Sequence, residues 1–345
     1  MKIGVLLATF NGEKYLKEQL DSIFHQTKQV DEIVISDDGS SDNTICIINE
    51  YIKMSNSIPI KLVFNREKHG VIYNIENAFR HSSADFLFFC DQDDVWKASK
   101  VESFYKALEE FPDYKLYFSN ATLTDEKLEP LGQGVWDVYL SYRKFTSEYC
   151  VLCGEEFVKK LSFDGNIVTG MSAAVRREVL NEIFPLDPDV LHDEIAAFYC
   201  SVNGGLVAIN EETAFYRQHT KNIVGLSGSA FVSNDKRRNS ILGLIKYSDQ
   251  NMAIVNSMYY KSKAFLSFDK LQKYPFLKSR YRFYKNKRDI SQCNKIAALF
   301  RMISLLFNGE YKRNEISYLK CFILDLAMVL FVGTKKGKNT FQSIN

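Results

Sequence analysis

No apolar run in the sequence reaches the roughly 18 residues that a helix needs to cross a bilayer. The two most apolar segments, residues 296–307 and 322–333, are shorter and carry Arg301 and Asp325. The first apolar run, residues 3–10, leads straight into an Asn-Gly pair, which is typical of a first strand and not of a signal peptide. We therefore expect neither a membrane-spanning helix nor a signal peptide.

Cysteine is scarce, and only Cys150 and Cys153 form a C-x-x-C pair. A zinc site of this type would need a second such pair or histidines at ligand spacing, and neither follows. The seven cysteines, an odd number, favour reduced thiols in a cytosolic protein. Internal repeats and long low-complexity linkers are also missing, which excludes repeat architectures.

Acidic and basic residues are unevenly distributed, although the net charge of the 345 residues is only +2. Residues 231–345 hold 22 Lys/Arg and 7 Asp/Glu, a net charge of +15, so the rest of the chain carries −13. This asymmetry predicts two functional regions, of which the basic one faces an anionic partner. We expect a catalytic domain over residues 1–228 and a basic, mainly helical region over residues 229–345.

Short apolar strands alternate with helical stretches over residues 1–120, which is typical of an α/β fold. The order predicts a mostly parallel sheet with helices on both faces, whose ligands lie at the carboxyl ends of the strands. Polar clusters follow four of the strands, at residues 9–12, 37–44, 65–74 and 91–94. Strands are expected at residues 3–8, 31–36, 60–64, 86–90 and 115–120, and helices at 13–26, 73–81 and 97–111.

Three carboxylates follow the expected buried strand at residues 86–90, namely Asp91, Asp93 and Asp94. Burying carboxylates without partners is costly, so such a strand end indicates a nearby cation or hydrogen-bond donors. Mg²⁺ and Mn²⁺ prefer oxygen ligands and share the phosphates of a bound nucleotide, which makes the Asp-x-Asp pair a candidate metal site. The alternative is that these acids only cap the next helix or face solvent.

Five motifs occur in a fixed order along the chain: Ala-Thr-Phe-Asn-Gly at 8–12, Ile-Ser-Asp-Asp-Gly-Ser-Ser-Asp at 35–42, Asp-Gln-Asp-Asp at 91–94, His-Asp at 192–193 and Tyr-Arg-Gln-His at 216–219. Through them residues 1–228 resemble family 2 glycosyltransferases, which have the GT-A fold, a Rossmann-like architecture that binds nucleotide sugars. The nearest subgroup is bacterial enzymes of O-antigen or capsular polysaccharide synthesis, among them rhamnosyl- and hexosyltransferases. The resemblance implies a transferase that uses a nucleotide-diphosphate sugar as donor.

The resemblance places the donor's nucleotide against the loops that follow the first three strands. Thr9 and Phe10 would surround the base, and Asp37 or Asp38 would accept hydrogen bonds from the base or the ribose. The chain departs from the family's frequent Ala-Arg-Asn triplet, because residues 72–74 read Ile-Tyr-Asn. The implied nucleotide-sugar contacts are Thr9, Phe10, Asn11, Asp37, Asp38, Asn65, Asn74, Asp91, Asp93, Arg217 and His219.

By the same resemblance, Asp93 coordinates a divalent ion, Mg²⁺ or Mn²⁺, and Asp91 contacts the ribose or the donor sugar. The ion would act as a Lewis acid that neutralises the leaving diphosphate. His219 would meet the metal or a phosphate, and Arg217 would add charge-assisted hydrogen bonds to the diphosphate.

Asp193 matches the family's catalytic base, which takes the proton of the acceptor hydroxyl on the face opposite the leaving group. Glu194 is the competing base, and a simple helix N-cap is the structural alternative for Asp193. Thr169 and Gly170 resemble the acceptor side, where small residues let the substrate approach. His192 would contact the acceptor or tune the base.

The basic region interleaves cations with aromatic residues at 273–288 and carries apolar residues at helical spacing in 296–307 and 319–330. Cationic amphipathic helices favour attachment to an anionic membrane surface, and a helical cap packed on the catalytic domain is the alternative. We expect a cytoplasmic, peripheral enzyme on the inner face of a bacterial membrane, which adds one sugar to a lipid-linked glycan acceptor. The alternatives are a non-catalytic glycosyltransferase-like scaffold, which predicts a damaged metal motif or base, and a nucleic-acid-binding protein, although no nucleic acid is expected.

Overall fold

The computed structural model describes residues 1–55, 57–66, 68–139, 145–164, 166–186, 190–220, 222, 259–260, 263, 274–290, 295–311, 322, 325 and 326. The chain divides into two compact units, Met1–Phe231 and Val232–Asn345. The first holds the sheet and the motifs, and the second is helical where it is described.

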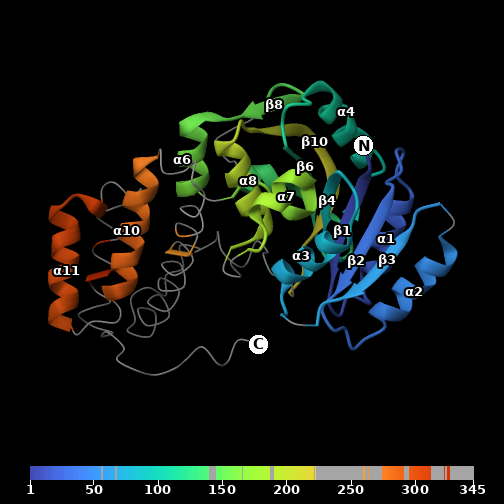
Figure 1. Cartoon of the computed structure of the whole chain (residues 1–345), viewed down its shortest axis with the longest axis horizontal. Coiled ribbons are helices and arrows are strands. Elements are labelled where there is room, and N and C mark those ends of the chain that lie inside the picture. The colour runs from blue at the N-terminus through green and yellow to red at the C-terminus, as the bar shows by residue number, and fades with distance from the viewer. Residues whose placement is uncertain are drawn as a thin grey trace. The chain divides into compact units, whose positions relative to one another are not determined.

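The first half of the sheet is parallel and buried. Its strands are β1 (Ile3–Thr9), β2 (Glu32–Asp37), β3 (Ile60–Phe64) and β4 (Phe86–Cys90), in the spatial order β3-β2-β1-β4. All three pairings are parallel, and every residue of β1, β2 and β4 is buried. Such strands need continuous apolar runs, which is why the sequence predicts them well. They are connected by α1 (Leu16–Phe24), α2 (Thr44–Met54) and α3 (Val71–His81) (Figure 1).

The second half of the sheet is mixed, which departs from the mostly parallel arrangement expected along the whole sheet. A short strand, β9 (Ala173–Arg176), is antiparallel to both β4 and β6 (Leu116–Thr124). The long strand β10 (Leu206–Arg217) is parallel to β6. Three short antiparallel strands complete the ten-stranded sheet: β5 (Val95–Trp96), β7 (Pro130–Gly134) and β8 (Tyr149–Leu152).

The helices of this half are α4 (Lys100–Glu110), α5 (Val135–Tyr139), α6 (Gly154–Asp164), α7 (Arg177–Ile183) and α8 (His192–Val202), with a short 3₁₀ turn, η1, at Gly170–Ser172. Nearly every residue of α8 is buried, including three at its start that are polar: His192, Asp193 and Glu194. A helix that is apolar over most of its length needs cover on all sides, and α8 packs against α6 and α7 (Figure 1). Its polar start is therefore held inside the protein.

The second unit contains α10 (Pro275–Ile290) and α11 (Lys295–Phe307), which pack through a shared apolar core. Inside it, Lys287 Nζ lies 3.1 Å from Asp325 Oδ2, and the same oxygen accepts a hydrogen bond from the Tyr311 hydroxyl at 2.7 Å. None of the helices in the described part of the chain combines the length and the apolarity that crossing a membrane requires. The apolar stretch expected at 319–330 lies outside the described residues except at 322, 325 and 326.

Candidate active site

The loops after β1, β2 and β4 are joined by hydrogen bonds at the carboxyl edge of the sheet. Gln92 accepts a hydrogen bond from the N–H of Phe10 at 2.9 Å and donates one to its carbonyl at 3.0 Å. The N–H of Ser41 donates to the Asn11 side chain at 2.8 Å, and the N–H of Asn11 donates to Ser40 Oγ at 2.8 Å. Three of the four polar clusters found in the sequence therefore form one surface, on which the Phe10 ring is 52% exposed.

The Asp37 carboxylate accepts four hydrogen bonds from its own surroundings. Its Oδ1 accepts from the N–H groups of Gly39 and Ser40 at 3.0 and 2.8 Å. Its Oδ2 accepts from the hydroxyls of Thr9 and Ser40 at 2.8 and 2.6 Å. Gly39 has φ = 92°, a conformation that favours glycine and closes this turn. Asp37 and Thr9 therefore shape the loop in which the sequence analysis expected nucleotide contacts.

Asp38 joins the fourth polar cluster to the same surface. Its Oδ1 accepts a hydrogen bond from Asn65 Nδ2 at 2.8 Å and lies 3.1 Å from His69 Nδ1, while its Oδ2 accepts from the N–H of Gly70 at 2.7 Å. Asn74 Nδ2 donates to the backbone carbonyl at the end of β1 at 3.1 Å. The Asn74 Oδ1 atom is buried and has no hydrogen-bond partner among the described residues, which makes it a free acceptor next to the loops.

The acidic turn after β4 holds three carboxyl groups within four residues. Burial, followed by the charge of Asp93, raises the pKa of Asp91 to about 7. The same two causes raise the pKa of Asp94 well above its usual range. The Asp94 side chain is 1% exposed, and its Oδ2 has no hydrogen-bond partner in the described part of the chain. Helix α4 begins only at Lys100, with Ser99 as N-cap, so the interpretation of Asp94 as a helix cap is wrong.

Asp93 and His219 meet at this turn. Asp93 Oδ2 lies 2.8 Å from Nε2 of His219. The contact is a hydrogen bond, and it sets a carboxylate oxygen beside an imidazole nitrogen, both of which are ligand types for divalent ions. The structure therefore brings together the two residues that the sequence selected as metal ligands. Within the described residues, no cluster of three or more His, Cys, Asp or Glu side chains is arranged to hold an ion.

Arg217 is placed differently from the expectation that it binds the diphosphate. Its side chain is 3% exposed, and all three guanidinium nitrogens donate to protein groups. Nε donates to the Asp93 carbonyl at 2.8 Å, Nη1 donates to the Glu126 carbonyl at 2.6 Å, and Nη2 donates to the Glu18 carboxylate. Its N–H donates to Asp94 Oδ1 at 3.1 Å. Arg217 therefore stabilises the acidic turn through buried hydrogen bonds.

Tyr15, which precedes α1, fixes His219 and was not selected from the sequence. Its ring is stacked on the His219 ring, with centroids 5.0 Å apart and planes inclined by 25°. The Arg217 guanidinium lies 4.6 Å from the Tyr15 centroid, and the Tyr15 hydroxyl donates to Glu126 at 2.6 Å. The N–H of His219 donates to Asn222 Oδ1 at 2.6 Å. These contacts hold the imidazole in position beside Asp93.

Asp193 lies within the first turn of α8, whose N-cap is Leu191, so the interpretation of Asp193 as the N-cap is wrong. Its carboxylate accepts a hydrogen bond from the N–H of Glu194 at 2.7 Å, and the backbone of Gly170 acts to lower its pKa. Burial, then the neighbouring Glu194 charge, raises the pKa of Asp193 from 3.8 to about 7. The Asp91 charge also raises it, so the Asp193 carboxyl lies within electrostatic range of the acidic turn.

The expected acceptor-side residues surround Asp193. A Cβ atom on Gly170 would lie 3.1 Å from His192 Nε2, which is a tight contact, and 3.7 Å from Asp193 Oδ2, so a larger residue would press on His192. Burial lowers the pKa of His192 to about 4, which keeps the imidazole neutral, and the Phe89 ring lies 4.6 Å from it. The Thr169 hydroxyl is engaged by the Ser172 hydroxyl at 2.7 Å. Residues 169–172 and His192 are therefore tightly packed beside the buried Asp193 carboxylate.

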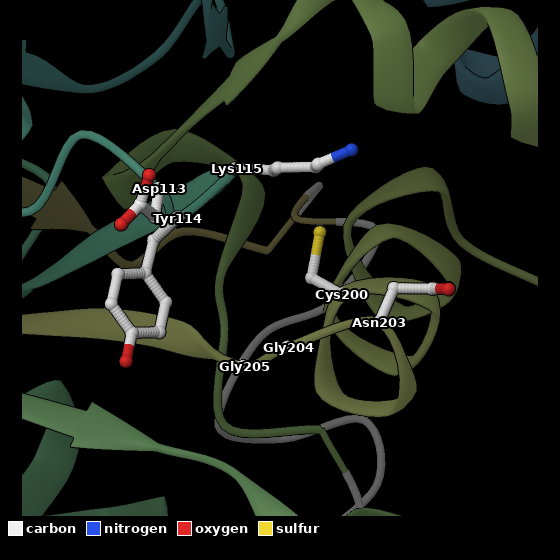
Figure 2. Close-up of a pocket in the computed structure, with 7 residues that line it drawn as sticks. All are labelled: Asp113, Tyr114, Lys115, Cys200, Asn203, Gly204 and Gly205. Atoms are coloured by element: carbon white, nitrogen blue, oxygen red, sulfur yellow. The ribbon is translucent and has the colours of Figure 1, made fainter.

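A pocket of about 190 Å³ lies at the other end of the strands, where β6 and β10 begin, and is distinct from this site. Figure 2 shows Cys200 and Asn203 at the end of α8, with Asp113, Tyr114 and Lys115 on the segment that leads into β6. Burial raises the pKa of the Cys200 thiol, which keeps it protonated and unreactive.

Comparisons with known proteins agree with this architecture. A protein-family model described as glycosyl transferase family 2 matches residues 4–184. An uncharacterised glycosyltransferase of Nostoc sp. is 26% identical over 231 residues, which cover 64% of this chain and 66% of that protein. The Escherichia coli UDP-Glc:alpha-D-GlcNAc-diphosphoundecaprenol beta-1,3-glucosyltransferase WfgD is 30% identical over 100 residues, 29% of this chain and 38% of that protein. The chain thus spans less than two thirds of the length of these curated relatives.

The fold is similar to that of S. aureus TarS 1–349 in complex with UDP-GlcNAc. The two share a TM-score of 0.55 and 16% sequence identity, over 95% of this chain and 91% of that one. The predicted α/β class with a GT-A fold is confirmed by this similarity. Because the family model covers more than half of its length, the chain belongs to glycosyl transferase family 2.

Proposed function

We propose that the chain is an inverting, metal-dependent glycosyltransferase of bacterial O-antigen or capsule synthesis. It would move one sugar from a nucleotide-diphosphate sugar to a lipid-linked glycan acceptor. The observation that carries the proposal is Asp193, a buried carboxylate with a pKa of about 7 beside the acidic turn. A general base works best when its pKa lies near the working pH, and few buried carboxylates are placed in this way without a chemical role.

In the proposed step, Asp193 takes the proton of the acceptor hydroxyl while the hydroxyl oxygen attacks the anomeric carbon. The bond between that carbon and the diphosphate oxygen breaks on the opposite face, so the sugar's configuration inverts. The proton stays on Asp193, and the nucleoside diphosphate leaves with the bonding electrons. His192 is neutral and packed beside the base, where it excludes water and orients the acceptor without taking the proton.

Asp93 and His219 would hold a Mg²⁺ or Mn²⁺ ion, with the diphosphate and water as further ligands. When bound, the ion supplies Lewis-acid neutralisation of the leaving diphosphate. The raised pKa values of Asp91 and Asp94 support a cationic ligand, because a divalent ion would offset the mutual repulsion of these neighbouring carboxylates. Arg217 and Tyr15 would keep the two ion ligands in position.

The donor would lie on the joined loops after β1 to β4. The exposed Phe10 ring offers a stacking surface for the base, and Asn74 Oδ1 offers an unused acceptor. That TarS was solved with UDP-GlcNAc and that WfgD is named for a diphosphoundecaprenol-linked acceptor supports a nucleotide-sugar donor and a lipid-linked acceptor.

The second unit would attach the enzyme to the inner, anionic face of the membrane. Helix α10 exposes Lys278, Arg282 and Lys285 at the spacing of one helix face. Helix α11 exposes Ile296, Phe300 and Phe307, which are 71%, 68% and 84% exposed, also at the spacing of one face. Cations with exposed large apolar side chains are typical of a helix at the membrane interface.

Nuclear magnetic resonance of the product tests the mechanism. Transfer from a donor of known anomeric configuration to a diphosphate-lipid acceptor should give a product with the opposite configuration. A product that retains the donor's configuration would require a nucleophile and would rule out Asp193 as the base of a single displacement.

A further inference from the structure

Glu126, in the turn between β6 and β7, is an acid whose side chain the proposed reaction does not use. Its Oε1 atom accepts hydrogen bonds from two residues just before α1, the Lys14 ammonium and the Tyr15 hydroxyl, the latter at 2.6 Å. The Glu126 side chain is 49% exposed, and ion pairs with such exposure contribute little to stability. The contact therefore matters chiefly for the groups that it holds in place.

The turn that carries Glu126 has a fixed and strained backbone. The Asp125 carboxylate accepts hydrogen bonds from the N–H groups of Lys127 and Glu129 at 2.8 and 2.9 Å. Leu128 has φ = 68°, in the left-handed region that a leucine rarely adopts. Such conformations persist where surrounding contacts fix them, and they gather at functional sites. The turn therefore presents Glu126 at a defined position.

The backbone of the turn is attached to the segment that leads to His219. Thr124, the last residue of β6, is paired with Arg217, the last residue of β10. The Glu126 carbonyl accepts a hydrogen bond from Arg217 Nη1 at 2.6 Å. The main chain of Glu126 is thus tied to the strand that precedes His219, while its side chain reaches Tyr15.

Tyr15 connects the Glu126 side chain to His219. The Tyr15 ring is stacked on the imidazole, with centroids 5.0 Å apart, and His219 Nε2 lies 2.8 Å from Asp93 Oδ2. The Tyr15 hydroxyl, at the far end of the same ring, donates to Glu126. Removal of this acceptor takes away a polar anchor of the ring and lets it tilt away from the imidazole.

We propose that Glu126 is a positioning residue that sets the place of the His219 imidazole beside Asp93 through the Tyr15 ring. The inference rests on the proposed function, because that function makes the imidazole a ligand of the divalent ion. Glu126 acts here as a hydrogen-bond acceptor. This separates its role from a general attraction between a cation and a negatively charged surface.

The test compares Glu126→Ala, Glu126→Gln and the control Glu102→Ala in the full chain. Alanine removes the acceptor, whereas glutamine removes the charge but keeps a side-chain oxygen that can accept from the Tyr15 hydroxyl. Glu102 on α4 is a matched control, because it also meets one lysine, Lys106 at 2.9 Å, and one hydroxyl, that of Thr27 at 2.7 Å. Its side chain is 40% exposed, close to the value for Glu126.

Two readouts need neither donor nor acceptor: nuclear magnetic resonance of histidine-labelled, ion-free protein, and Mn²⁺ binding followed by electron paramagnetic resonance. His219→Gln identifies the His219 signals among those of the five histidines. In Glu126→Ala these signals should move, because the stacked Tyr15 ring no longer shields the imidazole in the same way. Mn²⁺ should bind about threefold to tenfold more weakly, as for loss of a partner that orients a metal-binding histidine. Glu126→Gln should stay closer to wild type than to Glu126→Ala in both readouts, and Glu102→Ala should change neither.

Unmoved His219 signals in Glu126→Ala would overturn the proposal. Mn²⁺ binding that weakens equally in Glu126→Gln and Glu126→Ala would also overturn it, because the charge of Glu126 would then account for the effect. A wild-type protein that binds no Mn²⁺ would instead refute the metal assignment in the proposed function. The signals of the ion-free protein would then still decide whether Glu126 positions His219.

Discussion

Replacement of the proposed base should make the protein more stable and less active. Asp193→Asn keeps the size of the side chain but removes a buried negative charge. In the folded protein the pKa of Asp193 is raised from 3.8 to about 7, chiefly by burial. Between these two pH values the folded protein holds a proton that the unfolded chain has released. The free energy of unfolding therefore falls as the pH rises from about 4 to about 7, and the loss is complete above pH 7.

The size of this loss follows from the two pKa values. A difference from 3.8 to about 7, at 1.36 kcal/mol per pKa unit, corresponds to about 4 kcal/mol above pH 7. The asparagine replaces one acceptor oxygen by an NH₂ group, and a lost hydrogen bond to the N–H of Glu194 costs about 1 kcal/mol. We therefore expect Asp193→Asn to be about 3 kcal/mol more stable than wild type at pH 8 and about 1 kcal/mol less stable at pH 4.

Urea unfolding of the two proteins in EDTA, at intervals from pH 4 to pH 9, measures this difference directly. Transfer by Asp193→Asn should fall by about 10²- to 10⁴-fold, as expected for loss of a general base. Glu194→Gln is the matched control on the same helix turn, and it should keep transfer activity. Because the Glu194 charge raises the pKa of Asp193, the acid limb of the pH profile of this variant should move to lower pH. A stability difference that does not grow with pH refutes the assigned pKa. Loss of transfer in Glu194→Gln alone would reverse the roles of the two acids.

Three further outcomes follow from the site and the second unit. Asp93→Ala should lose Mn²⁺ binding and transfer but keep the wild-type melting temperature within a few degrees, and tight Mn²⁺ binding by this variant would contradict the ligand assignment. Tyr15→Leu should weaken Mn²⁺ binding about tenfold, because His219 loses its stacking partner. The control Tyr105→Leu, on the exposed side of α4, should leave Mn²⁺ binding unchanged. Equal effects of the two substitutions would show that Tyr15 has no role in holding His219. The double variant Phe300→Ser with Phe307→Ser should sediment less with anionic vesicles at every salt concentration, and binding that is equal for neutral and anionic vesicles would refute the electrostatic part of the attachment.

The parallel half of the fold could be predicted because its signals are local. Each of the strands β1, β2 and β4 is a continuous apolar run that ends in a polar cluster, and the carboxyl ends of parallel strands must meet. The strands β5 and β9 are too short to produce a period, and β9 has the sequence Ala-Ala-Val-Arg, which also fits a helix. The strand β7 has the sequence Pro-Leu-Gly-Gln-Gly, whose proline and glycines are typical of a turn. Their pairing is decided by neighbours far along the chain.

The site was predicted as a set of residues, but their contacts could not be. The 2.8 Å approach of Asp93 and His219 joins residues 126 positions apart. The burial of Arg217 depends on Glu18 and Glu126, which lie in other segments and carry no motif.

The most direct test of the account is a screen of nucleotide sugars for slow hydrolysis by the wild-type enzyme, with Mn²⁺ or Mg²⁺ and with EDTA. Release of the nucleoside diphosphate reports donor binding and activation without the unknown acceptor. We predict that one donor, or a small group with the same nucleotide, is hydrolysed only when the ion is present, and that Asp193→Asn slows this hydrolysis strongly. Hydrolysis that continues undiminished in EDTA, or the absence of hydrolysis with every donor and ion, would contradict a metal-dependent nucleotide-sugar transferase.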